Sequence, residues 1–125
     1  FLTASELGEG INLNLNKLYV LTSSATSGPA EMLINCLESV MEVIVIGQQT
    51  KGIGVACETF SDPVNDQLLH LAACHVTDIN NKADYIGVGI EPDYSIDPLS
   101  TIEGIQPFGS EHENLLAKAL ELINN

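Results

Sequence analysis

The sequence predicts an α/β fold built around a parallel strand–helix–strand unit. Two largely apolar runs without helical periodicity, at 18–22 and 43–46, indicate buried strands. Between them lies a segment with a helix start signal and apolar residues at helical spacing. Strands that are buried on both faces and joined by a helix are typical of a parallel sheet. We therefore expect parallel strands at 18–22 and 42–46, bridged by a helix that begins at residue 29.

The start of that helix is marked by three residues. Pro29 suits a first helical position, because its missing N–H would have no partner there. Gly28 precedes it as the cap, and Glu31 can accept the hydrogen bond of the cap N–H. An apolar face at helical spacing is expected to pack on the sheet; it comprises Met32, Leu33, Cys36, Leu37 and Val40.

Further elements are expected downstream. Residues 55–60 and 68–76 have strand character, and 84–110 is an irregular path rich in Gly, Pro and Asp. Tyr85 and Tyr94 on this path are expected to be packing residues. A last amphipathic helix should start near Ser110, with an apolar face made of Leu115, Leu116, Ala119, Leu120 and Ile123. A length of 125 residues is one domain's worth of chain, so 1–125 is predicted to be a single domain.

The charge balance excludes one class of partner. The chain has 4 lysines, no arginine and 17 acidic residues, for a net charge of -13. Nucleic acid binding needs clustered cations, so it is excluded, and an anionic membrane surface is disfavoured for the same reason. The longest apolar run, at 43–46, is too short to insert in a bilayer, and the first residues have no pattern of an export signal.

No metal or cofactor site is predicted. The three cysteines, Cys36, Cys57 and Cys74, form no CxxC pair, and their odd number favours buried free thiols. His70, His75 and His112 share no ligand spacing with them. An acidic group on the irregular path lacks the spacing of a calcium loop and indicates a solvated surface; it comprises Asp84, Glu91, Asp93 and Asp97.

The turn between the first strand and the first helix is the candidate site. A residue at a helix N-terminus lies beside free backbone N–H groups and the positive end of the helix dipole, where catalytic nucleophiles often occur. Thr26, Ser27 and Gly28 occupy this turn. The same residues can also serve only to cap the helix, and capping is the commoner role.

Four segments together resemble the S41 peptidases, the tail-specific or C-terminal processing proteases, in the form found in a bacterial cell-envelope subgroup. The first two are LYVLTSSATSGPAEMLINCL and VIVIGQQTKGIGV. The others are HVTDINNKADYIGVGIEPDYSID and the closing GSEHENLLAKALELI. The resemblance implies a crotonase-like or ClpP-like β-β-α fold, of which 1–125 is the C-terminal portion.

The resemblance also implies partners and a location. It implies a polypeptide substrate or peptide ligand, no cofactor, and a place in the cell envelope, in the periplasm or outside the cell. Because strands of the family's first half are not among these segments, we expect an exposed apolar edge or face. We therefore expect self-association or pairing with an upstream segment.

The residues that perform the family's chemistry are altered. In the family a serine attacks the peptide bond and a neutral lysine is its base. Glu31 aligns the serine position with Gly28, and Thr50-x-Gly52 aligns the lysine position with Ile53. Pro29 follows the nucleophile position and lacks the N–H that would contribute to the oxyanion hole. These changes predict a catalytically impaired peptidase-like domain.

Two alternatives stay open. Ser27 and Lys51 are 24 residues apart, close to the 25 that separate Gly28 from Ile53, and Gly28 supplies an N–H directly after Ser27. A shifted Ser27–Lys51 dyad would therefore make an active serine peptidase. The other alternative is a non-enzymatic module that binds or scaffolds a peptide.

Overall fold

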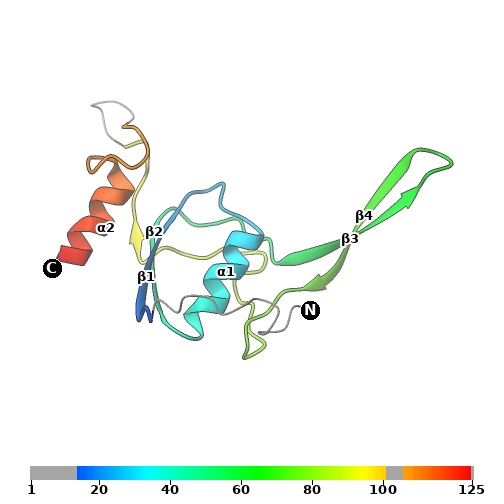
Figure 1. The fold of residues 1–125 in the computed structure, drawn as a ribbon, viewed down its shortest axis with the longest axis horizontal. Helices are drawn as coiled ribbons and strands as arrows, with labels where there is room; N and C mark the ends of the chain where they lie inside the picture. Colours follow the sequence, from blue (N-terminus) through cyan, green and yellow to red (C-terminus); the bar gives the residue numbers. More distant parts are fainter. Residues whose placement is uncertain (1–13, 101–105, 125) are drawn as a thin grey trace.

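The computed structural model describes residues 14–100 and 106–124, which form a mixed α/β structure (Figure 1). Strand β1 covers Lys17–Thr22, helix α1 Pro29–Glu38 and strand β2 Glu42–Gly47. Strands β3 and β4 cover Val55–Asp62 and Gln67–His75. Strand β5 covers Tyr94–Ser95 and helix α2 covers Asn114–Asn124.

The predicted parallel unit is confirmed. β1 and β2 pair in parallel from Lys17 opposite Glu42 to Thr22 opposite Gly47. α1 begins at Pro29, and the Glu31 carboxylate accepts the Gly28 N–H at 2.9 Å, as the start signal predicts. The strand boundaries agree with the predicted ones to within one residue at each end.

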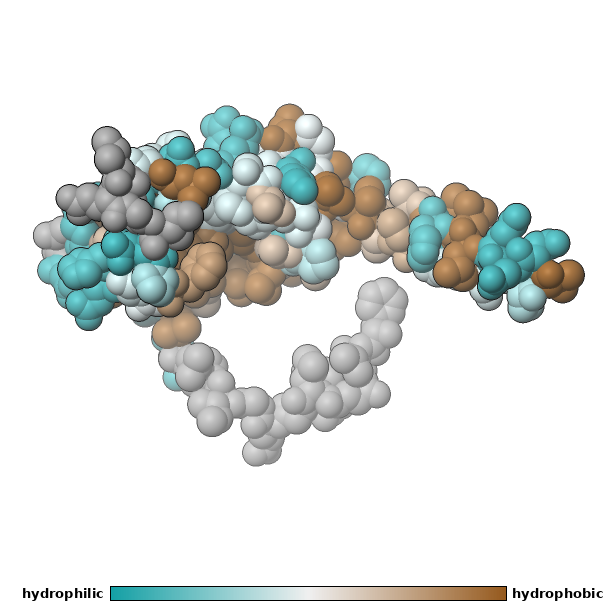
Figure 2. All heavy atoms as spheres, turned by 90° about the horizontal axis from the view of Figure 1, so that it is seen from above, coloured by the Kyte–Doolittle hydropathy of each residue, from teal (hydrophilic) through white to brown (hydrophobic). Residues whose placement is uncertain are grey.

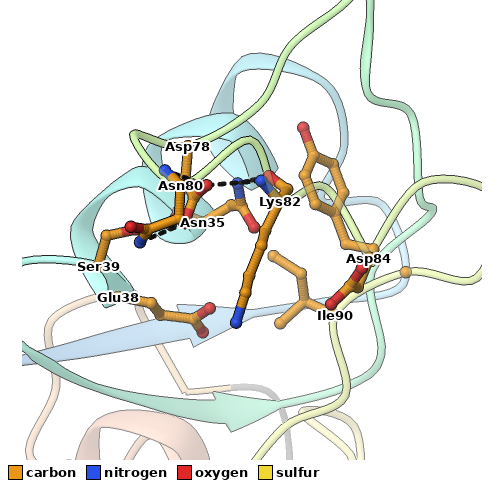
Figure 3. A pocket seen from close by; sticks show the side chains of 10 residues that line it. Asn35, Glu38, Ser39, Asp78, Asn80, Lys82, Asp84 and Ile90 are labelled. Atoms are coloured by element: carbon orange, nitrogen blue, oxygen red, sulfur yellow. Dashed lines mark hydrogen bonds between the residues drawn. The ribbon is translucent and has the colours of Figure 1, made fainter.

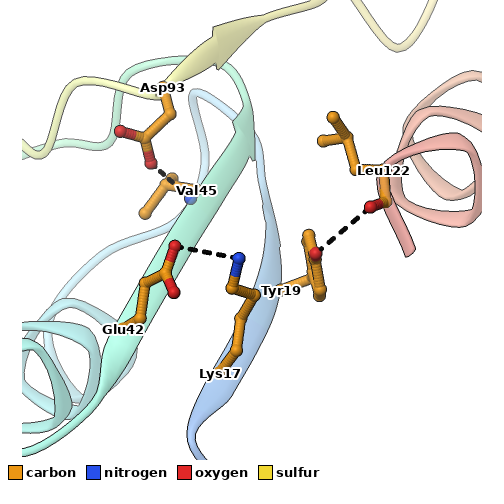
Figure 4. A network of polar contacts seen from close by, with 6 residues as sticks. All are labelled: Lys17, Tyr19, Glu42, Val45, Asp93 and Leu122. Atoms are coloured by element: carbon orange, nitrogen blue, oxygen red, sulfur yellow. Dashed lines mark hydrogen bonds and ion pairs between the residues drawn. The ribbon is translucent and has the colours of Figure 1, made fainter. Parts of the chain in front are cut away.

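A third strand extends this sheet beyond the sequence prediction. β5 pairs in parallel with β2, so the strand order is β1-β2-β5. Just before β5, the Asp93 carboxylate accepts the N–H of Val45 at 2.8 Å and so continues the pairing with a side chain (Figure 4). Part of the predicted irregular path is therefore a strand. Two residues are too few to produce an alternating pattern in the sequence.

The sheet packs on both faces. Ile46, Leu115 and Ala119 form a buried cluster between the sheet and α2, with Tyr19 and Leu122 partly buried against it. The Tyr19 hydroxyl also donates to the Leu122 carbonyl at 3.4 Å (Figure 4). Since neighbouring strand residues point to opposite faces, the buried Val45 lies on the other side of the sheet, where α1 contacts β2. The side of the sheet away from α2 is thus the side that carries the candidate site.

Helix α2 starts later than predicted. It begins at Asn114, because Glu113 closes the preceding turn and caps the helix. The Glu113 carboxylate accepts the N–H groups of Leu115 at 3.2 Å and Leu116 at 2.9 Å. A glutamate does not belong to the common N-cap residues, so the sequence signal points to Ser110 instead.

The predicted inner face of α1 is only partly right, since Cys36 and Leu37 are half-buried but the other members are exposed. The residues that α1 buries are Glu31 and Ile34, whereas Leu33 and Val40 are exposed. The helix is rotated about its axis because the Glu31 carboxylate turns inward to bind the loop after β2. Within the described residues, part of the apolar face of α1 is therefore exposed to solvent.

The β3–β4 hairpin extends away from the rest of the structure (Figures 1 and 2). The two strands pair antiparallel, as their sequences allow, with an irregularity between Ala56 and Cys57. Cys57 and Cys74 lie on this arm as exposed free thiols, and Cys36 is half-buried. The prediction of buried thiols is therefore wrong, because no layer of the described chain covers the arm.

The described residues contain neither a membrane-spanning helix nor a metal cluster. None of the helices in 14–100 and 106–124 is long and apolar enough to cross a membrane. No group of three or more His, Cys, Asp or Glu side chains within the same ranges is arranged to hold a metal ion.

Candidate functional site

The turn between β1 and α1 holds Gly28 in an unusual conformation. Gly28 has φ 60° and ψ -118°, which side chains of L-residues rarely tolerate. A sharp strand-to-helix turn of this kind is also used to expose a nucleophile. A Cβ atom on Gly28 would meet nothing within 4 Å. Position 28 therefore faces open space, as the position of a nucleophile must.

The loop after β2 packs against this turn. The N–H of Lys51 donates to the Thr26 carbonyl at 3.0 Å. On its other side, the loop is joined to Ile90, whose carbonyl accepts the Thr50 N–H at 3.1 Å and whose N–H donates to the Thr50 hydroxyl at 2.8 Å. The loop is thus fixed between the turn that precedes α1 and the segment that leads to β5.

Glu31 joins the turn to the loop. Its side chain is fully buried, and its Oε1 atom accepts the Thr50 hydroxyl and the Gly52 N–H. Its Oε2 atom accepts the N–H groups of Gly28 at 2.9 Å and Ile53 at 2.8 Å. Burial alone would raise the pKa of Glu31, but these hydrogen bonds outweigh it and hold the pKa below its ordinary value. A buried carboxylate therefore organises the site in its charged form.

The two positions that the resemblance assigns to nucleophile and base lie side by side. The N–H groups of Gly28 and Ile53 point to one and the same oxygen atom, Oε2 of Glu31. Side chains at 28 and 53 could thus work together, but these residues are a glycine and an isoleucine. Pro29 follows at the first helical position, where it offers no N–H.

The backbone segments that carry Ser27 and Lys51 lie side by side. Ser27 is half-buried and Lys51 is exposed, and the Lys51 N–H binds the carbonyl of Thr26, the neighbour of Ser27. Neither side chain forms a hydrogen bond or an ion pair with the residues in 14–100 and 106–124. A Ser27–Lys51 dyad therefore stays a prediction.

Tyr85 is a buried member of the site that the sequence suggested only as a packing residue. Its ring is 4% exposed, and its hydroxyl has no hydrogen-bond partner among the described residues. Burial raises the pKa of Tyr85, and the nearby Glu31 carboxylate and Cys36 thiol raise it further. The hydroxyl therefore stays protonated beside the Glu31 network. The adjacent Asp-Tyr pair is the only signal of it in the sequence.

A cavity of about 450 Å³ opens near the C-terminal end of α1, and Tyr85 and Ile90 are part of its lining (Figure 3). Lys82 extends between Glu38 and Asp84 there. Partial desolvation at the cavity, and then the charge of Asp93, raises the pKa of Glu38, although the residue stays largely exposed. On the cavity wall, the Ser39 hydroxyl donates to Asp78 at 2.6 Å, and this bond lowers the pKa of Asp78. The lining residues lie in or beside two of the S41-like segments, but the resemblance assigns them no role.

Almost the whole chain is similar to a solved structure. It is a crystal structure of a protein from Bacteroides fragilis NCTC 9343 with the name "Putative S41 protease". The two agree with a TM-score of 0.86 and 40% sequence identity over 97% of this chain. The resemblance to the S41 peptidases is confirmed. This S41-like chain spans 31% of the length of that protein, so it corresponds to a portion of it.

The other comparisons found nothing. No family model matches the chain, and no curated protein matches it. The S41 resemblance thus rests on the structural match and on the sequence segments that carry the motif.

Proposed function

We propose that this S41-like chain is part of a crotonase-like peptidase domain that has lost catalysis and binds polypeptide without cleaving it. The observation that carries the proposal is the pairing of positions 28 and 53 around Oε2 of Glu31. The scaffold that would bring a nucleophile to its base is intact, while the two side chains that would react are absent. By the same resemblance, we propose a place in the cell envelope or outside the cell.

Each altered position removes a different requirement of acyl transfer. Gly28 has no side chain that could attack a carbonyl. Ile53 has no group that could accept a proton. Pro29 lacks an oxyanion-hole donor, a loss that typically costs about 10²–10³ in rate by itself. Because such groups act as a unit, the loss of one already removes nearly all turnover, and the loss of the others adds little.

The open space in front of Gly28 supports peptide binding, and not only the loss of catalysis. The Glu31 network holds the Gly28 turn at a positive φ, which glycine adopts without strain and a residue with a side chain rarely adopts. The turn is therefore fixed in shape and open in front of Gly28, although glycine has no chemistry to perform there. We propose that the turn and the loop after β2 keep a surface on which an extended peptide lies.

A second candidate function follows from the contact between Lys51 and Thr26. Because the Lys51 N–H donates to the Thr26 carbonyl, the backbone at 51 lies beside the residue that precedes Ser27. An active Ser27–Lys51 dyad would need the N–H of Gly28 as an oxyanion donor, but that N–H donates to the Glu31 carboxylate at 2.9 Å. Against it, Lys51 is exposed, and a lysine acts as a base only when desolvation keeps it neutral.

Hydrolysis of an unstructured protein substrate distinguishes the two functions. We expect no cleavage by the unmodified protein, because no nucleophile and base are paired at 28 and 53. Ser27→Ala and Lys51→Ala are the matched controls and should leave this baseline unchanged. Cleavage that both controls abolish would refute the loss of catalysis and establish the shifted dyad.

A further inference from the structure

The β3–β4 hairpin has one apolar face that no part of the described chain covers. Directly opposed residues of an antiparallel pair share a face, and successive pairs alternate between the two faces. Phe60 opposite Leu69 and Glu58 opposite Leu71 therefore lie on the same face. Phe60 is 49% exposed, Leu69 56% and Leu71 47%. We call this surface, made of Phe60, Leu69 and Leu71, the Phe60 face.

The opposite face has fewer large apolar side chains. It carries Thr59 opposite His70, whose side chains are joined by a hydrogen bond of 2.8 Å, Ser61 opposite Leu68, and Cys57 opposite Ala72. Figure 2 shows polar and apolar side chains close together along the arm. A two-stranded hairpin is marginally stable alone in water. An arm with one apolar face therefore gains stability when a partner covers that face.

The charges around the Phe60 face indicate the partner. Glu58 and Asp62 lie two residues on either side of Phe60 on β3, so both belong to its face, and the Asp62 carboxylate also accepts hydrogen bonds from Val64 and Asn65 in the turn. Asp66 adds a third carboxylate at the tip, and 55–75 contains no lysine or arginine. The Glu58 carboxylate accepts no hydrogen bond from the described residues, so it is open to a cation from outside.

A second copy of the chain is a poor match for this face. Each copy has a net charge of -13, and two Phe60 faces in contact would bring carboxylates together around their centres. Like charges that face each other on sheets are destabilising. The complementary occupant combines apolar side chains with lysine or arginine.

We propose that the Phe60 face docks an extended basic segment of another protein. The segment would alternate cationic and apolar residues on its inner side, so that an apolar residue lies on Phe60 and its cations reach Glu58 and Asp62. The period of two residues in an extended chain matches the Glu58-x-Phe60-x-Asp62 spacing. This docking is separate from the Gly28 turn and does not depend on hydrolysis.

Binding of synthetic peptides to the full chain tests the proposal. A labelled peptide with the repeat Lys-Thr-Leu-Thr is expected to bind, with NMR shift changes at the amides of 58–62 and 67–71. Peptides with the repeats Glu-Thr-Leu-Thr and Lys-Thr-Ser-Thr should not bind, since one lacks the charge and the other the apolar groups. Equal binding of the acidic peptide would overturn the proposal.

Matched variants on the two faces localise the contact. Leu69→Thr is expected to weaken binding about tenfold or more, because an apolar contact is lost while threonine keeps the strand. Leu68→Thr, on the opposite face, should leave the affinity unchanged. Glu58→Lys changes only an exposed charge and is expected to weaken binding about fivefold.

Two results would contradict the docking of a basic segment. One is an equal loss of affinity in Leu68→Thr and Leu69→Thr, which would remove the Phe60 face from the contact. The other is a dimer in sedimentation equilibrium that Leu69→Thr dissociates, since it would assign the face to a second copy.

Discussion

Replacing Glu31 by alanine is expected to destabilise the protein by about 3–5 kcal/mol, because it leaves three backbone N–H groups and the Thr50 hydroxyl without their acceptor. Gly52 is buried, so water replaces the carboxylate poorly there. Urea unfolding at pH 7 measures the change. The loop at 50–53 should also lose its protection in amide hydrogen exchange.

Glu38→Ala is the matched control on the same helix. The Glu38 side chain is exposed and accepts no hydrogen bond from the described residues, so its loss should change the stability by less than about 0.5 kcal/mol. Glu31→Gln should remain clearly destabilised, since its amide group would face the N–H donors of Gly28 or Gly52. Equal stability of Glu31→Ala and Glu38→Ala would refute the organising role of Glu31.

The Glu31 network also makes the free energy of unfolding depend on pH. Hydrogen bonds lower the pKa of Glu31 in the folded state. The contribution of Glu31 to the stability of the fold is therefore complete above the ordinary glutamate pKa of about 4.3. It is lost as the pH falls through the lower folded pKa. The stability gap between the unmodified protein and Glu31→Gln should therefore narrow in acid, which urea titrations from neutral to acidic pH measure.

The second large effect is expected from Gly47→Ala at the end of β2. Gly47 has φ 132°, and a Cβ atom there would lie 2.0 Å from the carbonyl oxygen of Thr22. Thr22 is buried and pairs with Gly47, so neither backbone can move without breaking the end of the β1–β2 ladder. We expect a loss of more than about 3 kcal/mol, from strain and overlap together.

Gly87→Ala separates these two causes. Gly87 also has a positive φ, of 82°, but a Cβ atom there would meet nothing within 4 Å. Only the strain remains, so a loss of about 1 kcal/mol is expected. Thermal unfolding of both variants makes the comparison. Similar losses would show that the Thr22 carbonyl does not constrain position 47.

The parallel unit could be predicted because its signals are local. The apolar runs at 18–22 and 43–46 and the Gly28-Pro29-Glu31 start each act through the backbone of their own segment. The pairing of positions 28 and 53 followed from the family resemblance, and the structure places them around one oxygen atom. Sequence periodicity alone could not have joined two loops that are 25 residues apart.

What the sequence could not predict depends on contacts between distant segments. The rotation of α1 follows from the inward turn of Glu31 toward the loop after β2, whereas its apolar spacing alone favours Leu33 and Val40 as inner residues. β5 depends on an existing β2 edge, to which Asp93 guides the chain. The exposure of the hairpin, and with it of Cys57, depends on which layers surround it.

Reaction with a fluorophosphonate probe, followed by intact mass and peptide mapping, tests the central claim most directly. The probe reports an activated serine even where substrate binding or turnover is weak, so it asks only whether the site holds a nucleophile. If Gly28, Pro29 and Ile53 leave the site without an activated nucleophile, no adduct forms on the unmodified protein, including at Ser27. A stoichiometric adduct on Ser27 that Lys51→Ala abolishes would contradict the claim.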